Sequence, residues 1–323
     1  MTFRAVGRAT ARAGRAALRA SGPLVVRGLR GLTDGVVPDV AVPPAGRAVD
    51  LPGRGSTHVV DLPGPGADAP VVLLMHGIAT TGSLTWFSVL EELSRTYRVV
   101  TFDQRWHGRG IRSDRFALDD CADDAAAVLD ALGIERAVVV GYSMGGASAQ
   151  VMWHRHPQRV AGLVLCSTAA RWQGHLGERV FFLGLRAANL GLLSVAASKV
   201  RAHAEMLPED VAEEAELRAW CMAELKSTSP WALPVVLGEL GRFDSADWIG
   251  DVSVPTGVVI TARDRAIPTA RQRELAMLVP QATVREAPGG HASLVFDLGN
   301  WKPVFLEVLG EVADEAAKTA AAG

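Results

Sequence analysis

Short apolar runs recur along the middle of the chain, separated by longer stretches of mixed polarity. These runs are continuous and rich in β-branched residues, and they lie at residues 71–75 (VVLLM), 97–102 (YRVVTF), 137–142 (AVVVGY), 161–166 (AGLVLC) and 256–262 (TGVVITA). Runs of this length without alternation are typical of strands that are buried on both faces of a parallel sheet. The pattern therefore predicts five buried parallel strands.

Between these runs lie segments with helical periodicity. They occur near residues 84–95, 119–132 and 144–156, and Pro157 closes the last of them. Strands that alternate with helices predict an α/β protein with an open, mostly parallel sheet flanked by helices. Ahead of the first run, residues 46–64 show short alternating stretches separated by PGRG, a pattern that predicts an antiparallel hairpin.

One interval breaks the alternation and suggests how the chain is divided. Roughly 90 residues separate the run ending at Cys166 from the one starting at Thr256, too many for one crossover helix. Residues 174–242 are mostly helical in pattern, and we expect an insertion that caps the sheet. The predicted divisions are a basic extension with linker (1–45), an α/β core (46–170 and 250–311), a helical cap or lid (171–249) and a C-terminal tail (312–323).

Composition narrows the class of protein. The chain has 323 residues, of which 49% are hydrophobic, and its net charge of −2 argues against a nucleic-acid-binding protein. Its three cysteines, Cys121, Cys166 and Cys221, have neither disulfide-framework nor metal-ligand spacing, so we predict no metal site. The glycine-containing loops 52–55 and 108–113 lack the nucleotide-binding fingerprints, so we predict no cofactor. Because no apolar stretch could span a bilayer and no secretory signal is evident, we expect a cytoplasmic protein.

The first 33 residues form a separate basic segment. They hold seven arginines and no acidic residue, and five of these arginines share one helical face: Arg4, Arg8, Arg12, Arg15 and Arg19. The segment is a candidate for salt-sensitive, peripheral contact with an anionic membrane. Its apolar face is poor, and a disordered leader or an organelle transit peptide has the same composition. A Pro/Gly-rich linker follows at residues 34–46.

Ser143 lies between glycines at the end of the run 137–142, in the sequence GYSMGG. The stretch fits G-x-S-x-G, in which the serine occupies a strained strand-to-helix turn and the following backbone N–H, here that of Met144, points at a developing oxyanion. Any tight turn can use glycine and serine, so the assignment depends on partners elsewhere in the chain. The predicted role of Ser143 is that of a nucleophile.

A serine nucleophile needs a histidine base and a carboxylate that orients the histidine. His291 follows the predicted last strand, 282–287, in the glycine-containing loop APGGHASL. Asp264 follows the run 256–262, and its alternative role is to cap a turn. The order Ser143, Asp264, His291 is the one used in this type of sheet. The later histidines His175 and His203 fall in the insertion, where a packing or solvated role is expected.

The loop after the first buried run, LLMHGIATTG (73–82), is the predicted source of a second oxyanion donor. We assign that donor to the backbone of Ile78, with Ala79 as the alternative and as a substrate contact. His76 precedes the nucleophile in the chain, so a role in bracing the loop is expected for it.

Taken in order, VVLLMHG, TFDQRWHGRG, GYSMGG, ITARDRAIP and PGGHAS closely resemble the α/β-hydrolase superfamily over residues 46–311. One departure is visible, because Trp106 stands where that family usually has glycine and Gly110 where it usually has serine. Trp106 is a candidate for the substrate pocket, although a packed indole explains it equally well. Trp172, Trp220 and Trp231 are candidates for the inner wall of the cap, with ordinary helix–helix packing as the alternative.

The resemblance implies a hydrolase with a Ser-His-Asp triad and no cofactor. A serine nucleophile disfavours the members of the superfamily that use aspartate, such as dehalogenases and epoxide hydrolases. We expect a carboxylic ester hydrolase that acts on a small-molecule ester or acyl substrate, because the insertion is apolar. Two alternatives remain open, a carbon–carbon bond or other biosynthetic hydrolase, and a ligand receptor on the same fold with little turnover.

Overall fold

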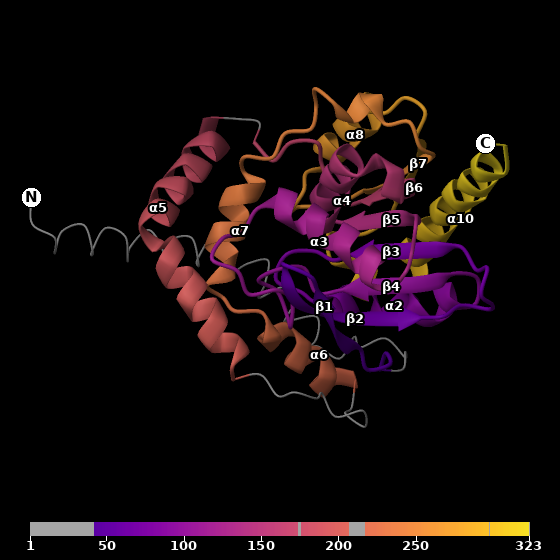
Figure 1. Cartoon of the computed structure of the whole chain (residues 1–323). Coiled ribbons are helices and arrows are strands. Elements are labelled where there is room, and N and C mark those ends of the chain that lie inside the picture. The colour runs from indigo at the N-terminus through magenta and orange to yellow at the C-terminus, as the bar shows by residue number, and fades with distance from the viewer. Residues whose placement is uncertain (1–41, 174–175, 207–216, 297, 323) are drawn as a thin grey trace, which may run out of the picture.

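The computed structural model describes residues 42–173, 176–206, 217–296 and 298–322. Its centre is an eight-stranded sheet in the order β1-β2-β4-β3-β5-β6-β7-β8 (Figure 1). β2 pairs antiparallel with both β1 and β4, and every later pairing is parallel. The strands are β1 (Arg47–Leu51), β2 (Gly55–Leu62), β3 (Val71–Met75), β4 (Arg98–Phe102), β5 (Ala137–Tyr142), β6 (Val160–Cys166), β7 (Thr256–Thr261) and β8 (Thr283–Ala287).

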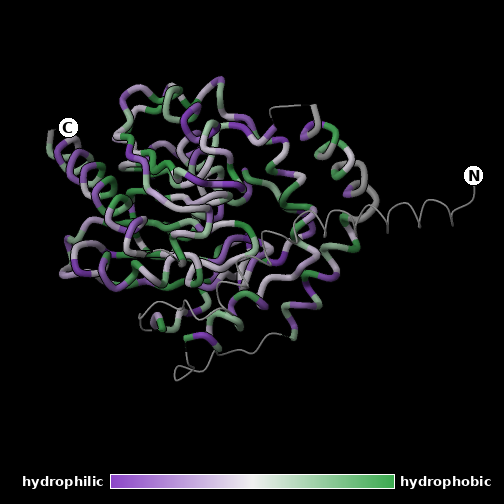
Figure 2. Tube along the Cα trace, turned by 180° about the vertical axis from the view of Figure 1, so that it is seen from behind, coloured by the Kyte–Doolittle hydropathy of each residue, from purple (hydrophilic) through white to green (hydrophobic). Residues whose placement is uncertain are grey.

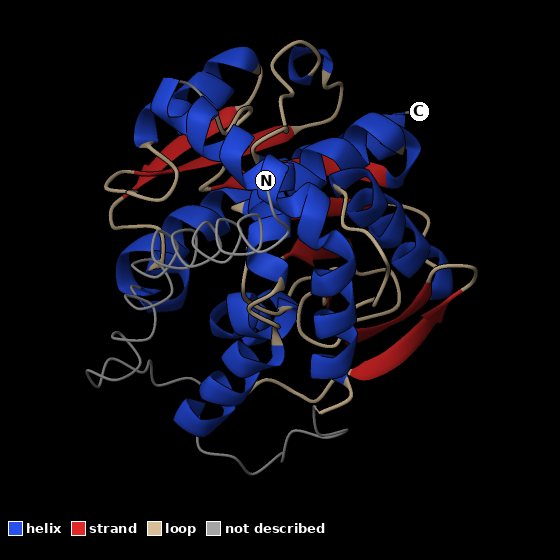
Figure 3. Ribbon diagram, turned by 90° about the vertical axis from the view of Figure 1, so that its left-hand side faces the viewer, coloured by secondary structure: helices blue, strands red, loops and turns tan. Residues whose placement is uncertain are grey.

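Helices cover both faces of the sheet (Figure 3). α2, α9 and α10 pack on one face, whereas α3, α4 and α8 pack on the other. α5, α6 and α7 lie between β6 and β7 in the chain and gather at one side of the sheet (Figure 1). The helices are α2 (Gly82–Ser94), α3 (Leu118–Ala131), α4 (Met144–Arg155), α5 (Leu176–Ala204), α6 (Leu217–Ser227), α7 (Ala232–Leu240), α8 (Thr269–Leu278), α9 (Ser293–Phe296) and α10 (Leu298–Ala322), with 3₁₀ turns η1 (Pro157–Arg159) and η2 (Ile249–Asp251).

The apolar runs are continuous because successive side chains enter different cores. Val72 and Leu74 of β3 pack with α2 and α10, while Leu73 and Met75 pack with α3 and α4. Side chains alternate between the two faces of a strand, so a strand that is covered on both faces is apolar at every position. In Figure 2 the green, hydrophobic colouring marks these apolar segments at the centre of the molecule.

The element predictions hold for the core, and the open α/β architecture is confirmed. Each apolar run coincides with a strand to within about one residue, and the predicted hairpin is β1–β2. Residues 171–249 do contain a helical insertion, α5 to α7, with their ends joined by an isolated bridge between Arg171 and Asp244.

The predicted C-terminal tail is wrong. α10 continues without a break to Ala322, and Val312, Ala313 and Ala316 are buried against the sheet. Alanine-rich sequence lacks large side chains but is strongly helical, and its small side chains pack closely against a sheet. The boundary placed after residue 311 therefore lies inside a core helix. Among the helices of the described residues, none combines the length and apolarity needed to cross a membrane.

Candidate active site

Ser143 occupies the tight turn between β5 and α4. Its backbone dihedrals are φ 55° and ψ −118°, a conformation that a residue with a side chain rarely adopts. The flanking glycines make the turn feasible: a Cβ on Gly141 would lie 2.3 Å from the Gly145 carbonyl oxygen, and one on Gly145 would lie 2.1 Å from that of Met75. The glycines are thus required by close backbone approach, and the serine is held at the carboxyl end of β5.

Three predicted residues meet at this point. Ser143 Oγ lies 2.9 Å from His291 Nε2, and His291 Nδ1 lies 2.7 Å from Asp264 Oδ2. With the proton on Nδ1, the imidazole donates to Asp264 and accepts the hydroxyl hydrogen of Ser143. The Asp264 side chain is fully buried, whereas that of His291 is 20% exposed. The arrangement leaves a basic nitrogen against the serine hydroxyl, as nucleophilic catalysis requires.

Asp264 is held by more than His291. Its Oδ1 accepts the backbone N–H groups of Ala266 and Ile267 at 2.8 and 2.9 Å. Its Oδ2 also accepts Gln272 Nε2 at 3.0 Å. Gln272 lies on α8 and was not singled out in the sequence, since nothing in TARQREL distinguishes it from a surface glutamine. The turn-capping role considered for Asp264 is therefore real, and one carboxylate both caps the turn and orients the histidine.

Tyr142 is a second residue that the sequence did not single out. Its hydroxyl donates a hydrogen bond to the His291 carbonyl, and its ring centroid lies 5.5 Å from that of the imidazole. Burial raises the pKa of Tyr142 above its usual value, so the phenol stays protonated and remains a donor. The variable position of G-x-S-x-G thus fixes the loop that carries the histidine, 149 residues further along the chain.

The loop after β3 lies beside the serine. A Cβ built on Gly77 would be 3.6 Å from Ser143 Cβ, and Ala79 has a positive φ of 62°. Neither the Ile78 nor the Met144 backbone N–H donates a hydrogen bond to an acceptor among the described residues. Met144 is the first residue of α4, where backbone N–H groups have no partner within the helix. Both groups are therefore free to bind a negative charge that develops near Ser143.

His76 braces this loop, as its place in the sequence predicts. Its Nδ1–H donates to the Gly77 carbonyl at 2.7 Å, while its Nε2 accepts the backbone N–H of Gln104 at 2.8 Å. Burial lowers the pKa of His76 to about 4, and burial together with the neighbouring His76 lowers that of His107 to about 3. Both imidazoles are consequently neutral at pH 7, and His76 serves as a fixed donor–acceptor pair.

The tryptophans predicted to line a pocket have different environments. Trp106 is fully buried, donates its indole N–H to the Ser113 carbonyl at 3.0 Å and has a φ of 65°. This left-handed conformation explains why glycine is usual there. The substrate contact predicted for Trp106 is wrong, because packing leaves no surface for a ligand.

The tryptophans of the insertion also differ from one another. Trp220 is 4% exposed and packs on Phe87 of α2, so the packing alternative holds and its predicted place on the pocket wall is wrong. Trp231 is 44% exposed at the start of α7. Trp172 is partly buried against the core, and its indole N–H has no acceptor among the described residues. His175 lies outside the described residues, and His203 Nε2 bonds the Lys226 carbonyl within the insertion.

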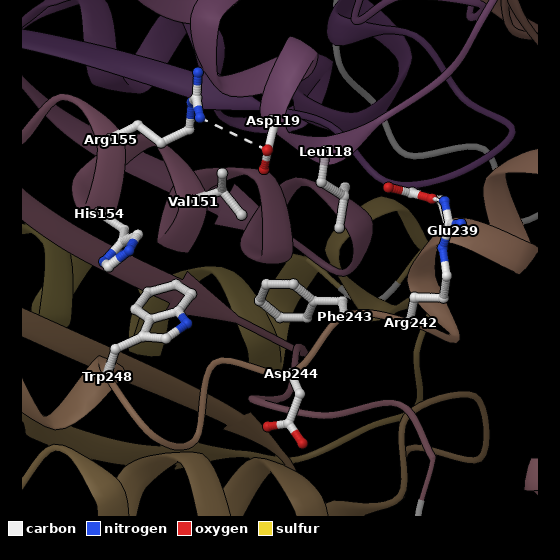
Figure 4. Close-up of a pocket in the computed structure, with 10 residues that line it drawn as sticks. All are labelled: Leu118, Asp119, Val151, His154, Arg155, Glu239, Arg242, Phe243, Asp244 and Trp248. Carbon is white, nitrogen blue, oxygen red and sulfur yellow. Dashed lines mark hydrogen bonds and ion pairs between the residues drawn. The ribbon is translucent and has the colours of Figure 1, made fainter.

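A surface cavity of about 420 Å³ lies away from the triad, between α3, α4 and the segment that follows α7 (Figure 4). His154 and Trp248 stack at one end with ring centroids 4.4 Å apart. The charged side chains of its wall pair with carboxylates or guanidinium groups nearby, namely Asp119 with Arg155, Glu239 with Arg242, and Asp244 with Arg171. Within the described residues, no group of His, Cys, Asp and Glu is arranged to hold a metal ion.

Comparison with known proteins identifies the family. A family model described as the alpha/beta hydrolase fold matches residues 70–298, which is more than half of the chain. The chain belongs to the alpha/beta-hydrolase family. Within this family it is similar to a protein of Caulobacter sp. (strain K31) named "Putative carbamate hydrolase RutD", with 31% identity over 241 residues, 72% of this chain and 87% of that protein.

Solved structures of other family members share the fold. The enol-lactonase of Burkholderia xenovorans LB400 superposes with a TM-score of 0.64 at 22% identity, covering 82% of this chain and 100% of that one. A thermophilic esterase of Thermogutta terrifontis superposes with a TM-score of 0.61 at 24% identity, covering 84% and 100% of the two chains. At these identities the likeness establishes the architecture, and the family membership establishes a hydrolase of this fold.

Proposed function

We propose that the protein is a serine hydrolase that cleaves a carboxylic ester of a small or acyl-chain substrate through an acyl-enzyme. The observation that supports it is the continuous hydrogen-bonded line from Ser143 through His291 to Asp264, at 2.9 and 2.7 Å. Such a line provides a nucleophile, a base and a group that fixes the base's tautomer. The two free N–H groups beside the serine complete what acyl transfer requires.

The proposed reaction begins with transfer of the Ser143 hydroxyl proton to His291 Nε2 as Oγ attacks the ester carbonyl carbon. The carbonyl oxygen becomes an oxyanion and receives hydrogen bonds from the N–H groups of Met144 and Ile78. Asp264 stabilises the imidazolium that forms. Collapse of the tetrahedral intermediate breaks the bond to the alcohol, which leaves with the proton from His291. Water, deprotonated by His291, then releases the acid by the same steps in reverse.

Carbamates are a second candidate substrate class. The observation that favours them is the relative from Caulobacter, whose name describes a carbamate hydrolase. A carbamate carbonyl can be attacked by the same serine and stabilised by the same donors. A panel of p-nitrophenyl esters of increasing acyl length, run beside p-nitrophenyl carbamates, ranks the two classes by kcat/KM. Turnover of a vinylogous diketone alone would favour the carbon–carbon hydrolase, and tight ligand binding without turnover would favour the receptor.

The decisive experiment is labelling by a fluorophosphonate probe. We expect a covalent adduct on the peptide that contains Ser143, and we expect Ser143→Ala and His291→Ala each to lower turnover by roughly 10⁴-fold or more. The double variant should lose little further, because the two residues act as a unit. Labelling at a different serine, or a Ser143→Ala variant with near wild-type turnover, would contradict the proposal.

A further inference from the structure

One buried carboxylate joins the insertion to two loops of the core. Glu224, on α6, is 3% exposed. Its Oε1 accepts Arg109 Nη1 at 2.9 Å, and its Oε2 accepts the hydroxyl of Thr81 at 2.5 Å. Each carboxylate oxygen therefore accepts a hydrogen bond from a different loop of the core. Because a buried carboxylate is costly to leave unpaired, the two partners and Glu224 stay together when α6 is in place.

Thr81 is the last residue of the loop that carries Ile78. Its hydroxyl caps α2 by accepting the Leu84 backbone N–H at 3.0 Å, in addition to its bond with Glu224. The next residue, Gly82, donates its N–H to Asp103 Oδ1 at 2.8 Å. Asp103 Oδ2 in turn accepts the backbone N–H of Arg109 at 2.8 Å. The end of the loop is therefore held by one connected set of hydrogen bonds that includes the insertion.

The start of the same loop is held by His76. Thr80 Oγ1 donates to the Gly77 carbonyl at 2.9 Å and lies 2.7 Å from Thr85 Oγ1, so only Ile78 and Ala79 lie between held residues. Ala79 lies between them with a φ of 62°, which an alanine keeps only where its surroundings impose it. If the Thr81 end were released, the loop could relax from this conformation. Relaxation would change the position of the Ile78 N–H relative to the serine.

We propose that Glu224 is a positioning residue: acting through Thr81, it holds the Ile78 N–H where a tetrahedral intermediate on Ser143 needs it. The inference rests on the proposed function. Its consequence is that the donor site is complete only when α6 is seated on the core. Substrate contacts that favour the seated insertion would then also strengthen the stabilisation of the transition state, which is a form of induced fit.

Other contacts hold α6 itself, so the role of Glu224 can be separated from folding. Thr228, one residue after α6, accepts the Gly108 backbone N–H at 3.0 Å. Trp220 and Cys221 of α6 pack on Leu84 and Phe87 of α2. These contacts remain when the Glu224 carboxylate is replaced by an amide. We therefore expect Glu224→Gln to fold with α6 in place but with a poorer loop geometry.

The test compares four full-length variants with p-nitrophenyl butyrate as substrate and a trifluoromethyl ketone as an analogue of the tetrahedral intermediate. We expect Glu224→Gln and Thr81→Val to lower kcat by about 10–100-fold, the range that a small misplacement of a reacting group produces. KM should change by less than about threefold, and the Ki of the ketone should rise by the same factor as kcat/KM falls. Thr81→Ser keeps the hydroxyl and should restore wild-type values. Glu239→Gln, another paired carboxylate of the insertion, is the matched control.

The outcomes separate the inference from the proposed function. If the wild-type protein hydrolyses the ester but Glu224→Gln and Thr81→Val leave kcat and ketone affinity unchanged, the inference is wrong and the proposed function stands. The same holds if kcat falls without weaker ketone binding, because such a loss does not arise at the oxyanion. If the wild type neither turns over ester nor reacts with a fluorophosphonate, both fail. Should Glu224→Gln not fold, the contrast between Thr81→Val and Thr81→Ser decides alone.

Discussion

Asp264 receives four hydrogen bonds, and each constrains where the imidazole of His291 can lie. Replacing one carboxylate oxygen by an amide would present an N–H₂ group to His291 Nδ1 or to the neighbouring donors. The imidazole would then favour the tautomer with its proton on Nε2, which cannot accept the serine proton. In the proposed reaction, Asp264 therefore acts through the protonation state of His291.

We predict that Asp264→Asn lowers kcat by about 10⁴-fold while the fold is retained. Gln272→Leu removes one donor to Asp264 and should cost far less, about tenfold, because three hydrogen bonds to the carboxylate remain. Steady-state kinetics with circular dichroism as a check on folding measure both effects. Glu178→Gln serves as the control, because the Glu178 carboxylate pairs with Arg271. Retention of more than about a tenth of wild-type turnover by Asp264→Asn would show that another carboxylate orients His291.

The buried histidines make stability depend on pH. In the folded protein the pKa of His76 is about 4 and that of His107 about 3, whereas an unfolded histidine titrates near its ordinary value of 6.5. Between these values the unfolded chain binds protons that the folded chain does not. The free energy of unfolding therefore rises with pH in this range, and stability is lost as the pH falls below about 6.5.

We predict a loss of about 1.4 kcal/mol per histidine for each pH unit below 6.5, down to the folded pKa. His107→Asn removes one titrating group, and its side-chain amide can still donate to the Arg105 carbonyl that His107 Nδ1 contacts at 3.0 Å. Urea unfolding at pH 7, 6 and 5 should show a shallower pH dependence for His107→Asn than for the wild type. Equal slopes would mean that His107 is not a buried neutral group.

At the scale of elements, α10 is held close to the sheet by the absence of side chains on two strands. A Cβ on Gly257 of β7 would lie 2.3 Å from Val308 Cγ1, and one on Gly162 of β6 would lie 2.8 Å from Val312 Cγ1. These glycines let the helix approach, and the valines of α10 fill the space. Because these contacts hold α10 on the sheet, Ala313 and Ala316 near its alanine-rich end are also part of the core.

We predict opposite effects for two Gly→Ala substitutions, one at this contact and one at an open position of α10. Gly257→Ala should destabilise the protein by about 1–3 kcal/mol, because the added methyl overpacks the interface with Val308. Gly310→Ala, within α10, meets no neighbouring atom within 4 Å and should stabilise it by about 0.5–1 kcal/mol through helix propensity. Thermal unfolding measures both. If Gly257→Ala matched the wild type, α10 would not pack as closely as described.

At the scale of the whole molecule, the charge is unevenly distributed along the chain. Residues 1–33 carry seven arginines and no acidic residue, although the net charge of the protein is −2. This segment lies outside the described residues. We propose that it contacts an anionic membrane surface, on the basis of its charge alone, since each basic residue near such a surface contributes about 1 kcal/mol.

The prediction is tested with full-length protein in which Arg4, Arg8, Arg12, Arg15 and Arg19 are replaced by glutamine. The apparent affinity for liposomes that contain anionic lipid, measured by co-sedimentation, should fall by at least about 100-fold. This fall corresponds to about 2.8 kcal/mol, which is less than the roughly 5 kcal/mol that five basic residues would contribute. Binding of the wild type should weaken as salt is added and should be absent with neutral lipid. Ester turnover should be unchanged, because the candidate catalytic residues lie far along the chain. Equal sedimentation of both proteins would rule out the contact.

Local sequence by itself determined where the buried strands lie and which residues could supply the chemistry. Apolar runs mark strands because a strand covered on both faces must be apolar at every position. GYSMGG marks the candidate nucleophile because only glycine permits the close backbone approach at Gly141 and Gly145. The positions of Asp264 and His291 after strands placed them at the same edge of the sheet as Ser143, since parallel strands end together.

The tertiary structure decided which residues surround these three. Gln272, Tyr142 and Glu224 look like ordinary residues of a helix, a strand end and an insertion, and they acquire a role only through partners 8, 149 and 143 residues away. Burial of Trp106 and Trp220, and the inclusion of the last helix in the core, also follow from contacts between distant segments. The physical reason is that hydrogen bonds and close packing depend on atomic distances across the fold, whereas a sequence pattern reports only the period and the chemistry of its own segment.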